Sequence, residues 1–340
     1  MGRVVLVTGV SRGLGGRFAR RIAAEPSIDR VIGVDVVPPR ENLGDVAFVR
    51  ADIRNPVIAK VIAGQGVDTV VHLSVQSSPN EPGRPGGRTS MKEHNVIGTM
   101  QLLAACQKAP GLERLVVLSS GAVYGSSSRD PAMFTEDMSA KQMPRSGYGK
   151  DVLEVEGYVR GFARRRPDVA VTTLRTASVI GPSVTSRLTS YFRLPVVPTV
   201  LGFDGRLQFL HEDDLLGVLD RATLAGVHGT FNVAGDGVLT LSQTLRRLGR
   251  PIVPVPTFAL GPLAAVFRQA GIQGVPTELR RYLMFGRGLD TSRMRTMLGF
   301  SPTYTTAEAL ESFGRALVPS ALPQPIRNLA TASGGGPTHG

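Results

Sequence analysis

Cysteine is almost absent from this chain of 340 residues, which contains only Cys106. A disulfide within the chain is therefore excluded, and we expect a protein of the reducing cytoplasm. Cys106 lies in the helical-looking segment LLAACQK, where we expect it to be a small, buried, apolar side chain.

Long apolar runs are also missing. The longest one after the first strand, FALGPLAAVF from Phe258, is interrupted by Pro262 and is far shorter than the ~20 residues that a membrane span requires. The opening segment MGRVVLVTGV has no long apolar core followed by a small-residue cleavage site, so we expect a first strand there rather than a signal peptide. These features predict a chain without a membrane span.

Lysine is scarce, and arginine supplies most of the 39 basic residues that give the chain a net charge of +12. The basic residues are scattered, apart from one tight run at 164–166, and no aromatic platform accompanies them. This pattern does not indicate a nucleic-acid partner. It is compatible with affinity for anionic small molecules such as nucleotide diphosphates.

Short β-branched runs alternate with longer helical stretches through the first half of the chain, which is typical of βαβ units. The runs are continuously apolar, as expected of strands that helices cover on both faces. The expected strands are 3–9, 30–36, 46–52, 68–74, 114–120 and 170–176, and the expected helices are 14–25, 56–64, 91–108 and 148–166. The sequence therefore predicts an α/β fold with a doubly wound parallel (Rossmann) sheet.

The regular alternation of strand and helix patterns becomes weaker after residue 176. We expect residues 1–176 to form the Rossmann core, with later contributions from about 205–235. In that later part, a strand runs into a helix at Asp213, which Asp213 or Asp214 is expected to cap, and GTFNVAG is expected to be a strand. Residues 177–204 and 236–318 are expected to form a smaller substrate-binding lobe. The tail at 319–340 is expected to be disordered.

A glycine-rich turn follows the first expected strand, in the segment VTGVSRGLGGRFARRI. Gly9 allows a sharp turn, Gly13 lets backbone approach a pyrophosphate, and Gly15 permits close packing of helix on strand. The other residues of this loop, expected to border the same cofactor, are Ser11, Arg12 and Leu14.

Asp35 ends the second expected strand, about 20 residues farther on, where an acidic side chain bonds the adenosine ribose hydroxyls. This carboxylate would repel a 2′-phosphate, which favours NAD as the cofactor. Arg12 would attract the same phosphate, which leaves NADP open.

Several further segments resemble the extended short-chain dehydrogenase/reductases of the NAD-dependent epimerase/dehydratase type, the group that includes UDP-glucose 4-epimerases. The resembling segments are ADIRNP, VVHLSV, NVIGTMQLLAAC, VVLSSGAVYG, TLRTASVIGP, FLHEDDLLGVL, GTFNVAG and DTSRMRTMLGFSP. The resemblance runs nearly end to end. It implies that Asp52 and Ile53 flank the adenine. The other cofactor contacts that it implies are Leu73, Ser74, Asn95 and Thr176.

The resemblance also predicts substrate contacts. This sequence differs from the family pattern at some of these positions, so it does not identify the sugar. Tyr124 follows the serine-bearing strand, and Arg206 lies one residue away from a basic position that faces the substrate diphosphate in the family. Ser178 and Thr176 replace the asparagine and proline of the family's LRPANVYGP stretch. The loop spacing differs as well, because Arg12 stands where extended members usually have glycine.

The family's catalytic pair is incomplete here. The resemblance makes Tyr148, in SGYGKDVLEVE, the acid/base that exchanges a proton with the substrate hydroxyl, and Ser120 its hydrogen-bonding partner. The lysine expected four residues after the tyrosine is Val152. Lys150 would project about 200° round the helix from Tyr148, so we do not expect it to substitute. A free tyrosine has a pKa near ~10, so losing the nearby ammonium should slow base catalysis by roughly 10²-fold.

Three functions remain open. The first is an NAD-dependent nucleotide-sugar epimerase/dehydratase-like oxidoreductase that works by transient hydride transfer, with reduced or altered activity. The second is a catalytically impaired NAD(P)-binding regulator or scaffold. The third is a dehydrogenase or reductase of a non-sugar alcohol or ketone. The first predicts a small-molecule partner, a nucleotide sugar.

Two further points concern metals and assembly. Residues 211–214, HEDD, are adjacent and point apart, so we expect no metal site. A homodimer through helices 91–108 and 148–166 would fit their sequence, but a face buried within one chain would read the same.

Overall fold

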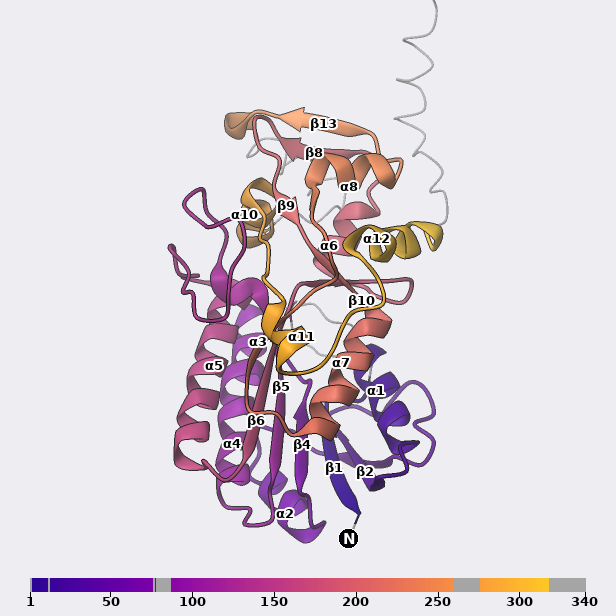
Figure 1. Cartoon of the computed structure of the whole chain (residues 1–340), viewed down its shortest axis with the longest axis vertical. Helices are drawn as coiled ribbons and strands as arrows, with labels where there is room; N and C mark the ends of the chain where they lie inside the picture. Colours follow the sequence, from indigo (N-terminus) through magenta and orange to yellow (C-terminus); the bar gives the residue numbers. More distant parts are fainter. Residues whose placement is uncertain (1, 12, 76, 78–86, 260–275, 318–340) are drawn as a thin grey trace, which may run out of the picture.

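The computed structural model describes residues 2–11, 13–75, 77, 87–259 and 276–317 of the chain. Its centre is a seven-stranded sheet in which every neighbouring pair of strands is parallel. The strand order is β11-β6-β5-β4-β1-β2-β3 (Figure 1). This is the order of a doubly wound Rossmann sheet, so the predicted fold class is confirmed.

The strands of this sheet lie where the sequence predicts them, and their ends differ from the prediction by at most two residues. They are β1 (Arg3–Thr8), β2 (Ile28–Asp35), β3 (Ala47–Arg50), β4 (Thr69–His72), β5 (Arg114–Ser120), β6 (Ala170–Thr176) and β11 (Gly229–Val233). The direction of winding reverses between the neighbours β1 and β4. A crevice is expected beyond the carboxyl ends of the strands at such a point.

Helices cover both faces of the sheet (Figure 1). Alternation along β1 shows how: Val5 and Val7 pack with Phe18 on one face, and Leu6 packs with Ile58 on the other. The helices of the first face are α1 (Gly13–Ala23) and α7 (Glu212–Ala225). Those of the second face are α2 (Val57–Gly64), α4 (Gly98–Gln107) and α5 (Gly147–Arg165). Two buried apolar layers therefore hold the sheet in place.

The helix predicted at 91–108 is broken into three segments. It begins as α3 (Arg88–Lys92), continues as the π-helical turn η1 (Glu93–Ile97), and ends as α4. A π turn inserts one extra residue into the helical ladder and is frequent at functional sites. It brings His94 and Asn95 into the buried interior.

A smaller lobe stands beyond the carboxyl edge of the sheet (Figure 1). Three two-stranded pairs contribute to it: β7 (Ser178–Ile180) with β10 (Phe209–His211), β8 (Val197–Val200) with β13 (Ile252–Val255), and β9 (Arg206–Leu207) with β12 (Leu239–Thr240). Its longer helices are α6 (Arg187–Phe192), α8 (Leu241–Arg247), α10 (Thr277–Phe285) and α12 (Thr306–Arg315). Three further short helical segments are η2 (Gly121–Tyr124), which follows β5 and packs on α5, η3 (Thr257–Ala259), and α11 (Ser292–Thr296), which packs on β11.

The start of α7 corrects one prediction. The helix begins at Glu212, and its cap is His211, whose Nδ1 accepts a hydrogen bond from the Asp213 amide at 3.2 Å. Asp214 does not cap it, because its two carboxylate oxygens accept from the amides of Thr303 (2.7 Å) and Tyr304 (3.0 Å). The expected Asp213 or Asp214 cap is therefore wrong, since tertiary contacts engage Asp214 elsewhere.

In the parts of the chain that the structure describes, no helix is both long and apolar enough to cross a membrane. Two predictions lie outside these parts: the cofactor contact of Arg12 and the disordered tail at 319–340.

Candidate functional site

A cavity of about 610 Å³ opens at the carboxyl edge of the sheet, where the winding reverses. Its lining comes from the glycine loop and α1, the loop after β2, residues 73–75 after β4, Leu118 of β5, residues 183–185 after β7, and Leu215 and Leu219 of α7. Of the predicted cofactor residues, the lining includes Gly9, Ser11, Gly13, Leu14, Gly15, Asp35, Leu73 and Ser74. Its size falls within the ~300–1,000 Å³ typical of small-molecule and cofactor sites.

The glycine loop has the geometry of a phosphate cradle. At Gly9, φ is +84° and an added Cβ would lie 3.1 Å from the Ser74 backbone. An added Cβ at Gly15 would lie 2.1 Å from the Gly9 carbonyl oxygen, so α1 packs against the turn without room for a side chain. At Gly13, φ is +46° and an added Cβ would meet nothing within 4 Å, so space is open at the head of α1. Backbone amides facing open space at a helix N-terminus fit a pyrophosphate.

Asp35, the last residue of β2, contacts this loop through hydrogen bonds. Its side chain is buried, Oδ2 accepts a hydrogen bond from the Ser11 amide at 3.1 Å, and Oδ1 accepts one from the Val36 amide at 2.8 Å. Asp35 therefore orders the loop through its contacts with Ser11 and Val36. Each carboxylate oxygen has a second lone pair.

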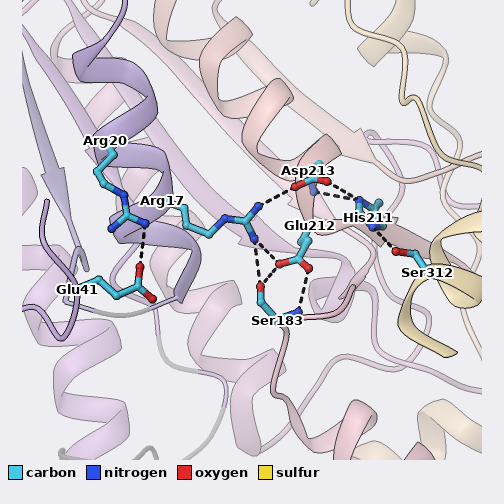
Figure 2. Close-up of polar contacts among 8 residues, drawn as sticks. All are labelled: Arg17, Arg20, Glu41, Ser183, His211, Glu212, Asp213 and Ser312. Atoms are coloured by element: carbon cyan, nitrogen blue, oxygen red, sulfur yellow. Dashed lines mark hydrogen bonds and ion pairs between the residues drawn. The ribbon is translucent and has the colours of Figure 1, made fainter. Parts of the chain in front are cut away.

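The mouth of the cavity carries charged residues that the sequence analysis did not identify. Arg20 of α1 forms an ion pair with Glu41 at 2.9 Å and donates to the Asn42 carbonyl oxygen at 2.8 Å, as Figure 2 shows for the first contact. These bonds hold the loop after β2 against α1. Arg40, which is exposed, also lines the cavity.

A hydrogen-bonded layer supports the wall after β4. The amides of Leu73 and Ser74 donate to Thr8 Oγ1 at 3.2 and 3.3 Å. Thr8 Oγ1 also contacts His72 Nδ1 at 2.8 Å. Burial, together with the neighbouring His94, lowers the pKa of the His72 imidazole to about 3. His72 is therefore a neutral structural residue behind the wall.

The two catalytic candidates lie on neighbouring elements. Tyr148 is the second residue of α5, and its half-buried side chain packs against the apolar cluster that contains Val123. Ser120 ends β5, and its Oγ accepts from the Ala122 amide at 3.2 Å. The O–H of Ser120 can still donate to another oxygen.

Val152 stands four residues after Tyr148, where the resemblance predicts a lysine. It is 1% exposed, and it packs among the apolar side chains of Val123, Tyr124, Phe134, Ala234 and Leu289. The side chain of Lys150 is 44% exposed and pairs with Glu154 at 3.7 Å. Lys150 therefore lies on the solvent face, as the rotation of the helix predicts.

A buried ion pair stands next to Val152. Asp151 is fully buried, and its two carboxylate oxygens accept hydrogen bonds from Nη1 and Nη2 of Arg88 in α3. Arg88 Nη2 also donates to the Gly147 carbonyl oxygen at 2.7 Å. The hydrogen bond to Asp151 raises the pKa of the Arg88 guanidinium. Asn95 Nδ2 approaches Asp151 at 3.4 Å, so the π turn also contacts this pair.

The lobe contributes a carboxylate to the head of α5. Glu278 of α10 accepts hydrogen bonds from the Tyr148 amide at 3.0 Å and from the Gly149 amide at 2.7 Å. A negative charge at a helix N-terminus is favourable, because it satisfies orphan amides and opposes the helix dipole. The tyrosine-bearing turn is thereby fixed to the lobe.

Four predicted cofactor residues lie away from the lining of the 610 Å³ cavity. Asp52 forms a two-point ion pair with Arg54, and Ile53 is 3% exposed. Asn95 contacts Asp151, as described, and Thr176 Oγ1 donates to the Ser119 carbonyl oxygen at 3.3 Å. Their roles toward a cofactor stay predictions.

The three predicted substrate residues are not brought together. The Tyr124 hydroxyl is bonded to Asn232 Oδ1 at 2.8 Å inside the core. Ser178 Oγ donates to the Tyr282 hydroxyl at 3.2 Å. Arg206 lines a separate cavity of about 270 Å³ in the lobe. These roles also stay predictions.

Within the described residues, no group of three or more His, Cys, Asp or Glu side chains is arranged to hold a metal ion. The side chains at 211–214 contact different partners, among them Ser312 for His211 and Arg17 for Glu212 (Figure 2).

Comparisons with known proteins agree with this architecture. Residues 5–234 match the model of the NAD dependent epimerase/dehydratase family. The uncharacterised protein Mb0513 of Mycobacterium bovis is 50% identical over 332 residues, which cover 96% of this chain and 88% of that protein.

Two solved structures are similar in fold. The UDP-glucose 4-epimerase of Thermotoga maritima, solved with UDP-glucose, has a TM-score of 0.70 at 21% identity, covering 92% of this chain and 98% of that one. The dTDP-glucose 4,6-dehydratase of Streptomyces venezuelae, solved with NAD and TYD bound, has a TM-score of 0.70 at 22% identity, covering 92% and 96%. At these identities the likeness establishes the shared fold.

Proposed function

The chain belongs to the NAD-dependent epimerase/dehydratase family, and we propose that it is an NAD-dependent oxidoreductase acting on a nucleotide sugar. The observation that carries this proposal is the 610 Å³ cavity at the winding reversal, which the glycine cradle and Asp35 border. Both similar structures described above act on nucleotide-linked glucose, and one contains NAD, which supports the substrate class. We also propose that the protein works in the cytoplasm.

The cofactor would be held by backbone more than by side chains. Amides of the loop from Gly9 to Gly15 would bond the pyrophosphate, and Asp35 would accept from the adenosine ribose hydroxyls. The Asp35 carboxylate on the wall favours NAD over a 2′-phosphorylated dinucleotide, which it would repel. When bound, the nicotinamide supplies hydride acceptance and return.

The chain's own groups would handle the proton. Tyr148 would exchange a proton with the substrate hydroxyl, and the Ser120 O–H would donate to the same substrate oxygen. The Arg88–Asp151 pair next to the tyrosine turn carries no net charge, so it does not replace the missing ammonium. Turnover should therefore be slow, by roughly 10²-fold relative to a family member with the lysine.

One observation favours a second candidate, a dinucleotide-binding protein without turnover. Val152 is part of an apolar cluster, and Lys150, two residues before it, pairs with Glu154 on the solvent face of α5. A protein whose tyrosine lacks a nearby ammonium can still bind the dinucleotide and act as a regulator or scaffold.

The test begins with mass spectrometry of nucleotides that remain bound after gentle purification, followed by calorimetry with NAD and NADP. Retained NAD, or NAD binding tighter than NADP binding, is the expected result. Incubation with UDP-glucose and UDP-glucuronic acid then separates the two candidates. Slow epimerised or dehydrated product supports the enzyme, and bound NAD without product supports the binding protein. Failure to bind either dinucleotide contradicts both.

A further inference from the structure

One wall of the cavity is formed by a short segment from the lobe side of the molecule. Residues 183–185, after β7, line the cavity together with the glycine loop of the sheet. Val184 is half-buried, whereas Ser183 and Thr185 are exposed and add little apolar packing. Polar contacts at Ser183 therefore contribute to the position of this segment.

Glu212 provides these contacts (Figure 2). Its carboxylate is 3% exposed, Oε1 accepts from the Ser183 amide at 3.0 Å, and Oε2 accepts from the Ser183 hydroxyl. The side chain also fills the space beside Gly181, where an added Cβ would lie 2.6 Å from Glu212 Cγ. Backbone and side chain of the segment are thus both fixed to the first residue of α7.

Arg17 of α1 compensates the buried charge. Its Nη1 contacts Glu212 Oε2 at 2.5 Å and donates to Ser183 Oγ at 3.1 Å, and its Nη2 pairs with Asp213 at 2.7 Å. Arg17 lies four residues after Gly13, on the helix whose head borders the open space for the pyrophosphate. The contacts therefore join the glycine-loop helix to the opposite wall.

A second ion pair joins the same two helices without touching the cavity. Arg21 of α1 pairs with Asp220 of α7, and neither side chain lines the cavity. Only the more buried pair, formed by Arg17 and Glu212, also contacts a cavity-lining segment.

We infer that Glu212 is a positioning residue for the dinucleotide, holding residues 183–185 against the bound cofactor while Arg17 balances its charge. The inference rests on the proposed NAD binding. Without Glu212, the Ser183 amide and the Arg17 guanidinium lose their shared acceptor, and the segment must be ordered when the cofactor binds. Ordering the segment costs conformational entropy, and this cost makes the binding free energy less favourable.

The test is Glu212→Gln in the full-length protein, with isothermal titration of NAD. The amide keeps the shape and removes the charge. We expect the Kd for NAD to rise by ~10-fold, the size of one lost charge-assisted hydrogen bond. Hydrogen exchange should show faster exchange of the Ser183 amide in the protein without cofactor, which a merely supportive role in helix packing would not produce.

Two further variants keep the test decisive. Ser183→Ala removes only the hydroxyl contact, so it should fold and raise the Kd by ~3-fold or more. Asp220→Asn breaks the other pair between the same helices and should leave the Kd for NAD within about twofold.

The outcomes separate this inference from the proposed function. If wild type binds NAD and both Glu212→Gln and Ser183→Ala bind it equally well, the inference is wrong and the proposed function stands. Equal weakening by Glu212→Gln and Asp220→Asn also overturns it, because helix packing alone would then explain the effect. If wild type binds neither NAD nor NADP, both fall.

Discussion

Arg88 and Asp151 form a two-point ion pair immediately before Val152, the position where the family's catalytic lysine is expected. The carboxylate is fully buried, whereas 39% of the arginine side chain is exposed. The pair fixes α3 to the head of α5, and its two charges offset each other. At the position where the resemblance predicts a lysine, this chain has a buried valine next to a buried ion pair.

Removal of the arginine should destabilise the fold. Arg88→Met leaves the Asp151 carboxylate buried without a cation, and we expect the free energy of unfolding to fall by roughly 2–4 kcal/mol. The Asp151→Asn, Arg88→Met double variant should recover most of this loss, because it removes the buried charge as well. Urea unfolding of the three proteins measures both effects. Equal stability of Arg88→Met and wild type would contradict the buried pair.

Restoration of the lysine tests how the missing ammonium limits activity. Val152→Lys places an amine among apolar side chains, which should lower the pKa of the ammonium and reduce the free energy of unfolding by roughly 2–4 kcal/mol. Val152→Met, with a side chain of similar length and no charge, is the matched control. If the protein is a slow enzyme, the lysine variant should convert UDP-glucose at least ~10-fold faster than the methionine variant. Absence of product from wild type and both variants would support the binding protein without turnover.

A methyl group at Gly13 should obstruct the cofactor. Gly13→Ala would project into the open space at the head of α1 and strain a backbone with φ of +46°. We expect the Kd for NAD to rise by ~10-fold or more, from steric exclusion. Gly44→Ala is a matched control, because Gly44 also has positive φ (+63°), meets nothing within 4 Å and does not line the cavity. Both variants share the backbone strain, so equal binding by the two would contradict a phosphate site at Gly13.

Acidification should weaken the fold through His72. Its pKa is about 3 in the folded protein, compared with an ordinary value of 6.5. The unfolded chain therefore binds a proton at higher pH than the folded chain, and the free energy of unfolding falls as the pH drops from 6.5 toward 3. Urea unfolding at pH 7, 6 and 5 measures this slope. His72→Gln should flatten it, and an unchanged slope in that variant would show that other groups cause the loss.

Much of the site could be predicted from short-range patterns. The order strand, glycine turn, helix places Gly9, Gly13 and Gly15 at the carboxyl end of β1, and Asp35 ends the next strand. In a parallel sheet these ends meet at one edge, so their convergence on the cavity follows from the sequence alone. Leu73 joins them for the same reason, because it follows β4.

Contacts between residues that are distant in sequence could not be predicted in this way. Ser183 and Glu212 lie far apart in sequence, and no periodicity relates a loop serine to the first residue of a helix. Arg88 and Asp151 likewise carry no sequence signal of their pairing, since charged residues on helices usually face solvent. The sequence around Asp214 fits a helix cap, but its carboxylate accepts hydrogen bonds from the amides of Thr303 and Tyr304, which are distant in sequence.

The sequence by itself determined the Rossmann sheet, the glycine turn after its first strand and the valine four residues after Tyr148, because each depends on residue type and on spacing within one strand, turn or helix. Tertiary structure decided what surrounds that valine and what holds residues 183–185 at the cavity. Those features depend on which residues, distant in sequence, lie together in the folded chain. A buried polar group needs a hydrogen-bonding partner, and the tertiary structure determines which residue provides it.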